Sequence, residues 1–318
     1  MRRIAPALAF LALVTLTPGA EAHPESWLDR RVLHFAHQGG EVEAPSDTLY
    51  ALKTAKRKGA DVVEIDVHAT ADGQIVALHD TTVDRTTEGT GRVDAMTLPE
   101  VQRLDAAYEF IPGCGTCADR PARDYRWRGV AAGKVRPPAG YRASDFRIPT
   151  LREVLAAFPD DLINIEIKRT APETSPYEQQ IADLLREFGR ANDVIVVSFS
   201  DVAIERFKTL APKIPTALAL GEGAAFKISS MGPLPGVGQS RYVALQVPVS
   251  FGGVEVVTKE FVDDAHAQKL AVHVWTINDE KTMRWLIDIG VDGIMTDVPT
   301  LLERVLAEKK VRWKQHRR

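Results

Sequence analysis

The chain has 318 residues, 45% of them hydrophobic, and a formal net charge of −3 at pH 7. This composition is that of an ordinary globular protein with enough apolar side chains for a large core. It argues against a nucleic-acid-binding protein, because the basic excess typical of that class is missing.

The first predicted element is a leader at the N-terminus. Arg2 and Arg3 precede the apolar run IAPALAFLALVTL, and the small-residue segment AEA follows at 20–22. A positive start, a short apolar stretch and an A-x-A site predict a secretory signal peptide over residues 1–22, cleaved after about Ala22. A membrane anchor would need about 20 apolar residues. We therefore expect a secreted or periplasmic protein without a stable membrane anchor.

Beyond the leader, short runs rich in β-branched residues alternate with amphipathic helical patterns such as 48–58 and 279–290. Strands that alternate with helices predict a parallel sheet. Eight such strands within one domain, over residues 32–307, favour a TIM (β/α)8 barrel. A doubly wound open sheet is the alternative, but it normally has fewer strands. The predicted strands are 32–38, 62–68, 162–168, 194–199, 216–220, 242–247, 271–276 and 293–297.

The second strand and its continuation, EIDVHATADGQIVALHD (64–80), carry an unusual alternation of polar and apolar residues. Glu64, Asp66 and His68 occupy every second position and so share one face of the strand. Asp72-Gly73 predicts a β-hairpin turn with an extra strand after it, and a two-residue turn would set Asp66 opposite His79. A charged site is one interpretation of this face, and a solvated hairpin face is the other.

Further polar residues end the other predicted strands, where a barrel enzyme has its active site. Charged groups that point into a barrel must be paired or bound to metal, because isolated ions are costly to desolvate. Glu64, Asp66 and Glu166 offer the oxygen ligands of a hard cation. Histidines beside such a cation suit general acid–base chemistry near neutral pH. The strand-end residues are His37, Glu166, Lys168, Trp275 and Asp297.

Several motifs together resemble the glycerophosphodiester phosphodiesterases, over roughly residues 32–307. EIDVHATADG followed by HD is the specific combination, whereas HQG or VWTIN alone would be weak. The resemblance implies a TIM barrel that hydrolyses a small-molecule glycerophosphodiester to sn-glycerol 3-phosphate and an alcohol, with Ca²⁺ or Mg²⁺. The motifs are HQG (37–39), APSDT (44–48), EIDVHATADG (64–73), LHD (78–80), EIK (166–168), VWTIN (274–278) and GVDGIMTD (290–297).

The resemblance also implies roles for individual residues. His37 and His79 would carry out acid–base catalysis, by direct hydrolysis or through a cyclic phosphate. Lys168 would help to neutralise the phosphate, and Trp275 would line the substrate pocket. The metal ligands would be Glu64, Asp66 and Glu166.

Two departures from the family pattern concern the phosphate site. Gln38 stands where relatives usually have an arginine that binds phosphate, and Ser46-Asp47 replace the Glu-Asn of the usual P-E-N-T motif. Gln38 would then meet the substrate as a neutral donor. The acid–base and metal residues are intact, which favours an active enzyme. A lysophospholipase D-type enzyme and a noncatalytic glycerophosphodiester-binding protein are the alternatives.

A Gly-, Pro- and Arg-rich insertion at about 105–147 interrupts the family pattern. It contains Cys114 and Cys117, for which a local disulfide is favoured in an exported chain; a zinc site would need further ligands. Because it follows the strand that ends in His79, we expect it to cover the active-site mouth as a lid, with a purely structural excursion as the alternative. One of its arginines, first of all Arg126 or Arg128, is predicted to reach the substrate.

The remaining polar residues have mostly structural interpretations. His34 lies on the face opposite His37, and His68 and His273 are candidates for the core or for support of the site. Asp297 is predicted either to support the site or to cap the helix that begins near Pro299. The basic segment 308–318 is predicted to be a solvated tail.

Overall fold

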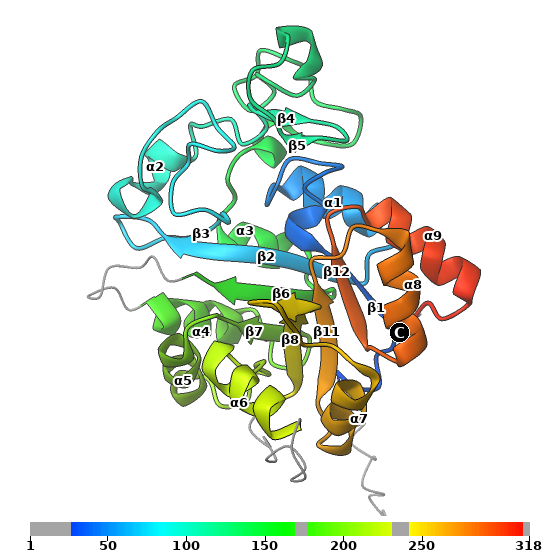
Figure 1. Cartoon of the computed structure of the whole chain (residues 1–318). Coiled ribbons are helices and arrows are strands. Elements are labelled where there is room, and N and C mark those ends of the chain that lie inside the picture. The colour runs from blue at the N-terminus through cyan, green and yellow to red at the C-terminus, as the bar shows by residue number, and fades with distance from the viewer. Residues whose placement is uncertain (1–26, 169–176, 231–241, 314–318) are drawn as a thin grey trace, which may run out of the picture.

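The computed structural model describes residues 27–168, 177–230 and 242–313. Its main sheet has eight strands, of which those in the order β7-β6-β2-β1-β12-β11-β8 pair in parallel, with β3 antiparallel to β2. The sheet curls around a common axis (Figure 1). The strands are β1 (Leu33–Ala36), β2 (Val62–Ala69), β3 (Ile75–Ala77), β6 (Leu162–Ile167), β7 (Val194–Val197), β8 (Ala244–Pro248), β11 (Ala271–Trp275) and β12 (Gly293–Thr296).

The gap between β7 and β8 is closed by isolated bridges. Val196 pairs in parallel with Thr216, and Ala217 pairs in parallel with Ala244. The predicted strand at 216–220 is therefore wrong in length, because α6 begins as early as Leu220. Its first residues nevertheless take the fifth position, so the predicted TIM-like α/β barrel is confirmed.

Helices surround the sheet on its outer side (Figure 1). The predicted helix at 279–290 is α8, which begins after the cap Asp279 and ends at Gly290 in the left-handed region, φ 96°. Polar N-caps and C-terminal glycine end helices in this way because they satisfy or relax the unpaired backbone groups there. The helices are α1 (Leu49–Arg57), α2 (Leu98–Val101), α3 (Leu151–Ala157), α4 (Tyr177–Glu187), α5 (Asp201–Leu210), α6 (Leu220–Ser230), α7 (Lys259–Ala267), α8 (Glu280–Ile289) and α9 (Pro299–Lys309).

The alternation in β2 is explained by the barrel. Ile65 and Val67 pack outward in an apolar cluster that includes Leu151 of α3 and Ile181 of α4. Glu64 and Asp66 therefore point into the barrel, and every residue of β2 is buried. Because both faces of a barrel strand are covered, polar side chains on the inner face must serve a buried site.

The hairpin after β2 has a different register from the one predicted. Val67 pairs with Ala77 and Ala69 with Ile75, so Asp66 lies opposite Leu78 rather than His79. The connection has three residues: the Thr70 and Gln74 backbones still bond, and Gly73 adopts φ 75°. Such a loop with glycine in the left-handed region is a common alternative to the two-residue turn.

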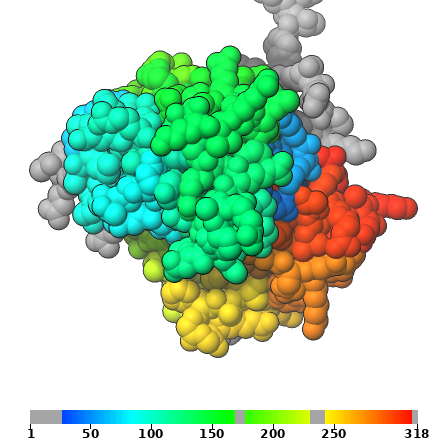
Figure 2. Space-filling view, turned by 90° about the horizontal axis from the view of Figure 1, so that it is seen from above, coloured from blue at the N-terminus to red at the C-terminus, as the bar shows by residue number. Residues whose placement is uncertain are grey.

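The insertion at 105–147 folds compactly against α1. The ring of Tyr50 stacks on Phe146 at a centroid distance of 4.4 Å, and Trp127 packs beside both rings. Lys53 of α1 pairs with Asp145 at 2.8 Å. Figure 2 shows the insertion, in green, spread across the face seen from above. The predicted disulfide between Cys114 and Cys117 is present.

Two expectations fall wholly or partly outside the described residues. The predicted signal peptide, 1–22, lies outside them, as do the last residues of the basic tail, 314–318. Arg312, earlier in that tail, pairs with Glu303 at 3.1 Å. Within the ranges that are described, no helix combines the length and the apolar character needed to span a membrane.

Candidate active site

A cavity of about 760 Å³ opens at the carboxyl ends of the barrel strands. Its wall includes most of the residues singled out in the sequence: His37, Glu64, His79, Glu166, Lys168 and Trp275. Asp66 lies beneath the wall and is fully buried. Segments far apart in the chain meet here because parallel strands all end at the same edge of a barrel.

Each of the two histidines on this wall is hydrogen-bonded to a carboxylate through Nδ1. His37 Nδ1 lies 2.6 Å from Asp297 Oδ1, and His79 Nδ1 lies 2.6 Å from Asp80 Oδ1. Asp297 also accepts a hydrogen bond of 2.6 Å from Asn278 Nδ2. A carboxylate on Nδ1 selects the tautomer and fixes the ring, and leaves Nε2 for proton transfer.

The pKa of His37 is raised to about 10. Burial works against the charged imidazolium, but the hydrogen bond that it donates to Asp297 and the nearby carboxylates of Glu64 and Asp66 outweigh it. The ring thus sits in a strongly negative environment.

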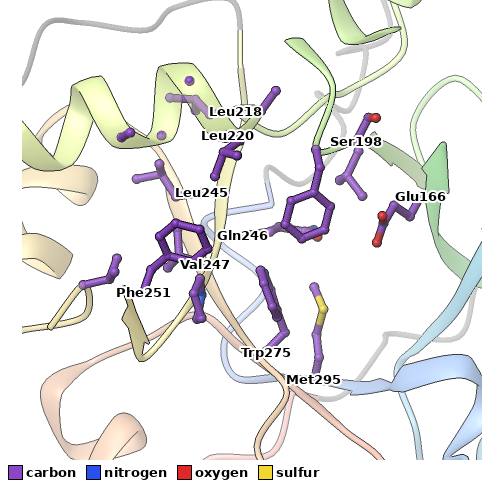
Figure 3. A pocket seen from close by; sticks show the side chains of 18 of the residues that line it. Glu166, Ser198, Leu218, Leu220, Leu245, Gln246, Val247, Phe251, Trp275 and Met295 are labelled. Carbon is purple, nitrogen blue, oxygen red and sulfur yellow. The ribbon is translucent and has the colours of Figure 1, made fainter. Parts of the chain in front are cut away.

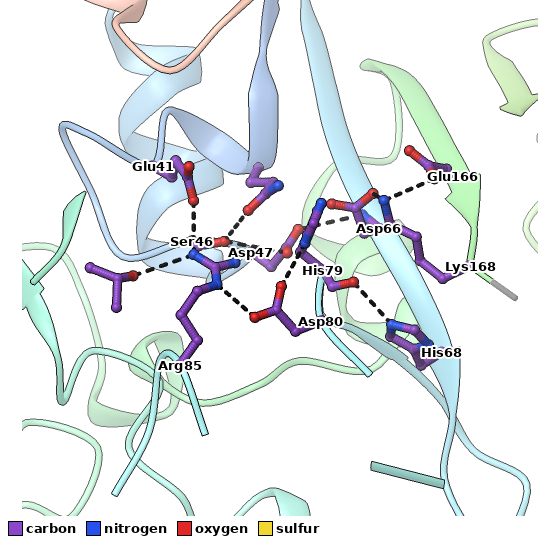
Figure 4. A network of polar contacts seen from close by, with 12 residues as sticks. Glu41, Ser46, Asp47, Asp66, His68, His79, Asp80, Arg85, Glu166 and Lys168 are labelled. Carbon is purple, nitrogen blue, oxygen red and sulfur yellow. Dashed lines mark hydrogen bonds and ion pairs between the residues drawn. The ribbon is translucent and has the colours of Figure 1, made fainter. Parts of the chain in front are cut away.

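A network of polar contacts holds His79 and its partner Asp80 in place (Figure 4). Arg85 Nε donates to Asp80 Oδ2 at 2.7 Å, and Arg85 Nη1 donates to Glu41 Oε2 at 3.1 Å. The hydrogen bond from His79 and then Arg85 hold the pKa of Asp80 well below its usual range. His68, which is buried, contacts the backbone oxygen of His79 through Nε2 at 3.1 Å.

The carboxylates of Glu64 and Asp66 on β2 form a candidate metal site beside the ring of His37. One ligand atom each from His37, Glu64 and Asp66 lie within 4.8 Å of one another. The pKa of Glu64 is raised to about 8, first by burial and then by repulsion from Asp66. Oδ2 of Asp66 is buried and has no hydrogen-bond partner among the described residues. Crowded oxygen donors with an unpaired buried oxygen fit a hard divalent cation.

Lys168 lies beside this group. Its Nζ is 3.0 Å from Asp66 Oδ1 and 2.8 Å from Glu166 Oε1. Glu166 is thus paired with Lys168 and is outside the His37–Glu64–Asp66 group in this arrangement. Burial opposes the charge on Lys168, but Asp66 and Glu166 raise its pKa above the usual value.

Gln38 takes an unusual conformation next to His37. Its φ is 51°, and the turn directs its backbone N–H to Glu64 Oε2 at 2.7 Å. The side chain accepts a hydrogen bond of 2.5 Å from Ser46 Oγ, while its Nε2 lies 3.4 Å from Nε2 of His37. The two residues that depart from the family pattern therefore contact each other.

The insertion supplies no residue to the cavity wall. Arg128 pairs with Glu109 at 3.1 Å and lies over the rings of Tyr108 and Tyr125, and Arg126 lies over Trp127. The expectation that one of these arginines reaches the substrate is therefore wrong for this structure. These arginines stabilise the insertion itself, because a planar guanidinium stacks well on an aromatic ring. The insertion contacts the site indirectly: Thr116 lies 3.4 Å from Arg85, and Gly113 donates a backbone hydrogen bond of 2.8 Å to Val42, which in turn donates to the backbone of Asp297.

Of the two carboxylates that bind the histidines, Asp80 is the one that was not predicted from the sequence. Asp80 follows His79 directly in LHD, so its position was a usable signal. Asp297 is one of the predicted strand-end residues, with two alternative roles. In the structure it binds His37, whereas Val298 is the cap residue of α9. No motif in the sequence indicated that Arg85 contacts the site.

The chain is similar in sequence to proteins of one enzyme family. The model of the glycerophosphoryl diester phosphodiesterase family matches residues 37–301. The chain is 30% identical over 274 residues to a glycerophosphodiester phosphodiesterase of Caldanaerobacter subterraneus subsp. tengcongensis, which covers 86% of this chain and 96% of that protein. It is 29% identical over 282 residues to one from Bacillus subtilis, covering 86% of each.

Solved structures share the fold. A glycerophosphodiester phosphodiesterase from Agrobacterium tumefaciens aligns with a TM-score of 0.63 at 24% identity, over 86% of this chain and 99% of that one. A phosphodiesterase from Oleispira antarctica, solved in complex with the product sn-glycerol-3-phosphate, aligns with a TM-score of 0.63 at 23% identity, over 89% and 99%. Given the family match and these relatives, the chain belongs to the glycerophosphoryl diester phosphodiesterase family of hydrolytic enzymes, as its motifs predicted.

Proposed function

We propose that this protein is a secreted, divalent-metal-dependent enzyme that hydrolyses glycerophosphodiesters to sn-glycerol 3-phosphate and an alcohol, with His37 and His79 moving the protons. The observation that carries the proposal is the pair of His–carboxylate contacts, His37–Asp297 and His79–Asp80, on one cavity wall. The product bound in the Oleispira antarctica structure supports the choice of substrate.

Phosphodiester hydrolysis needs two proton transfers. The attacking hydroxyl must lose a proton, and the departing alkoxide must gain one. Two histidines whose Nδ1 atoms are both held by carboxylates provide Nε2 as the exchanging atom at two places in the cavity. A protein that only binds glycerophosphodiesters would not need two histidines that are each held by a carboxylate.

The phosphate charge must also be balanced. Lys168 lines the cavity and carries a positive charge held by Asp66 and Glu166. Gln38 adds a neutral amide beside His37. Trp275 forms the adjoining wall, with its ring 5.4 Å from that of Phe199.

Glu64 and Asp66, with His37 beside them, would hold the divalent cation, and Glu166 is the further carboxylate within the same site. When bound, the cation would withdraw negative charge from the phosphoryl oxygens. An oxygen-rich set of donors favours Ca²⁺ or Mg²⁺ over softer metals.

The test uses the purified mature protein with glycerophosphocholine. We expect release of choline and sn-glycerol 3-phosphate, loss of turnover after chelation, and recovery with Ca²⁺ or Mg²⁺. The same additions should raise the melting temperature of the demetallated protein, because a ligand that binds only the folded state stabilises it. Full turnover in a metal-free sample would overturn the metal assignment.

Secretion is tested separately. Expression of the whole chain in a bacterium should yield an exported protein whose N-terminus begins after about Ala22, as read by mass spectrometry. An intact leader on a protein retained in the cytoplasm would contradict this part of the proposal.

A further inference from the structure

The cavity has two chemically different ends (Figure 3). Glu166 lies at one end, with the histidines and Lys168 on the same wall, and Leu220, Leu245 and Phe251 lie at the other, beyond Trp275. We call the second end the apolar arm. It is defined by Phe199, Leu220, Leu245, Val247, Phe251 and Val254.

The side chains of the apolar arm come from several segments of the chain. Leu220 begins α6, and Leu245 and Val247 belong to β8. Phe251 and Val254 face each other across the β9 (Ser250–Phe251) and β10 (Val254–Glu255) hairpin. The turn between them is Gly252-Gly253 with φ of 57° and 81°, a tight hairpin turn that places both side chains at the rim.

Exposed hydrophobic side chains gather on the wall of this cavity. Seven large ones are exposed in the described ranges, and five of them line this cavity. Scattered single apolar residues on a surface are normal, but a contiguous group marks a binding site. The five are Phe199, Leu220, Ile228, Phe251 and Val254, and the other two are Val135 and Val202.

A substrate made only of glycerol, phosphate and a small polar alcohol has no group that gains from such a surface. The arm is continuous with the catalytic wall, so whatever fills it is joined to the phosphate or lies next to it. The cavity of about 760 Å³ is within the range of sites that enclose much larger ligands than glycerol phosphate.

We propose that the apolar arm binds the hydrocarbon chain of an amphiphilic phosphodiester that carries one long acyl or alkyl chain. This inference rests on the proposed phosphodiesterase function and names its preferred substrate class. Over the whole reaction, the oxygen of water replaces the alcohol oxygen on phosphorus. One proton passes from water to a base of the enzyme, and one passes from an acid of the enzyme to the departing alcohol. The chain adds affinity without entering the chemistry.

The chain sits on either side of the phosphate in two substrate series that the test compares. In the first, 1-acyl-glycero-3-phosphocholines of six, eight and ten carbons release choline. In the second, n-alkyl esters of glycerol 3-phosphate of the same lengths release the alkanol. Both are used as monomers, with glycerophosphocholine as the chain-free reference. We expect kcat/KM to rise by up to about fourfold per methylene in one series until the arm is full.

Two variants and a matched control locate the effect. Val254→Ser removes an exposed apolar side chain from the arm and Val202→Ser removes one outside it. Val254→Ser should raise KM for the ten-carbon substrate by about threefold to tenfold, and Val202→Ser should not. Neither should change turnover of glycerophosphocholine.

Gly223→Leu fills the arm. Gly223 lines the cavity on α6, its φ is not in the left-handed range, and a Cβ there meets nothing within 4 Å. Leucine is also the better helix former. The variant should abolish most of the chain-length dependence while leaving hydrolysis of glycerophosphocholine intact.

The outcomes separate the two proposals. If glycerophosphocholine and both chain series are all inert, the phosphodiesterase proposal fails. If glycerophosphocholine is hydrolysed and chain length changes nothing, the apolar arm does not bind a chain. If Val254→Ser instead changes only the molecular mass in solution, the exposed group is a contact between copies of this chain and the inference is overturned.

Discussion

At the scale of single residues, the site contains two histidines that are each hydrogen-bonded to an aspartate. His79 is paired with its neighbour Asp80, whereas His37 is paired with Asp297, 260 positions later. In both pairs the Nδ1 contact is 2.6 Å. A ring held in one tautomer transfers protons through one defined atom, which is what general acid–base catalysis requires.

We expect His37→Ala and His79→Ala each to lower kcat by about 10²-fold or more, the usual scale for a lost acid–base group. The measurement is steady-state hydrolysis of glycerophosphocholine, with circular dichroism to show that the barrel is folded. His266→Ala is the matched control, because His266 also pairs with a buried carboxylate, Asp292, at 2.7 Å but lies outside the cavity wall. Near-normal rates in both cavity variants would refute the catalytic role.

Arg85 is a positioning residue for His79. It contacts Asp80, Glu41 and Thr116, and so joins the histidine pair to the loop at Glu41 and to the insertion. Without Arg85, Asp80 keeps the His79 contact but loses the group that orients its other oxygen.

We therefore predict that Arg85→Gln lowers kcat by about tenfold, the lower end for a partner that orients a functional ligand, with little change in KM. Arg85→Lys should recover part of the rate, because the positive charge remains while the planar fork is lost. Arg92→Gln serves as control, since Arg92 also pairs with an aspartate, Asp94, but on the surface. An unchanged kcat, or an equal loss in Arg85→Gln and Arg92→Gln, would count against positioning.

At the scale of elements, the short 3-10 turn His37–Gly39 joins β1 to the site. Gln38, Gly39 and Gly40 all have positive φ, 51°, 81° and 85°. This run folds the chain back so that the Gln38 N–H meets Glu64. A Cβ on Gly39 would lie 2.7 Å from the Cβ of Ala51 in α1, closer than any real contact.

Gly39→Ala should therefore lower the free energy of unfolding by more than backbone strain alone. Gly189→Ala isolates the strain, because Gly189 has φ 68° but a Cβ there meets nothing within 4 Å. We expect about 1 kcal/mol for Gly189→Ala and at least about twice that for Gly39→Ala, measured by urea unfolding. Equal losses would mean that α1 moves aside at no cost.

At the scale of the whole molecule, the barrel interior holds a buried neutral histidine. His273 of β11 packs against the rings of Phe35 and Trp27, and burial lowers its pKa to about 4. In the unfolded chain the pKa is about 6.5. As pH falls below 6.5, the unfolded state binds a proton that the folded state does not, so this residue makes the protein less stable between pH 6.5 and 4.

Comparison with His273→Gln checks this sign. Between pH 7 and pH 4, the wild type should lose up to about 3 kcal/mol more unfolding free energy than the variant. Subtracting the two pH profiles removes the contribution of the other titrating groups. Parallel profiles would show that His273 is not held neutral in the folded barrel.

Much of this architecture follows from local patterns in the sequence. The alternation of strands and helices predicts the barrel, and the helix at 279–290 is confirmed as α8 because its cap and final glycine are local signals. The alternation likewise predicts that Glu64 and Asp66 share one face of their strand, since period-two geometry depends on neighbouring residues alone. The same motifs identify the family.

Only the tertiary structure decides which distant groups meet. The Asp297 contact to His37, the Arg85 link to the insertion and the docking of that insertion on α1 depend on barrel closure. The hairpin register also could not be predicted from the sequence, because Asp72-Gly73 is compatible with a two-residue or a three-residue loop. In the structure, the backbone hydrogen bond between Thr70 and Gln74 closes a three-residue loop. The apolar arm is likewise a tertiary feature. Its side chains come from α6, β8 and the β9–β10 hairpin, and nothing in their spacing along the chain shows that they share one cavity.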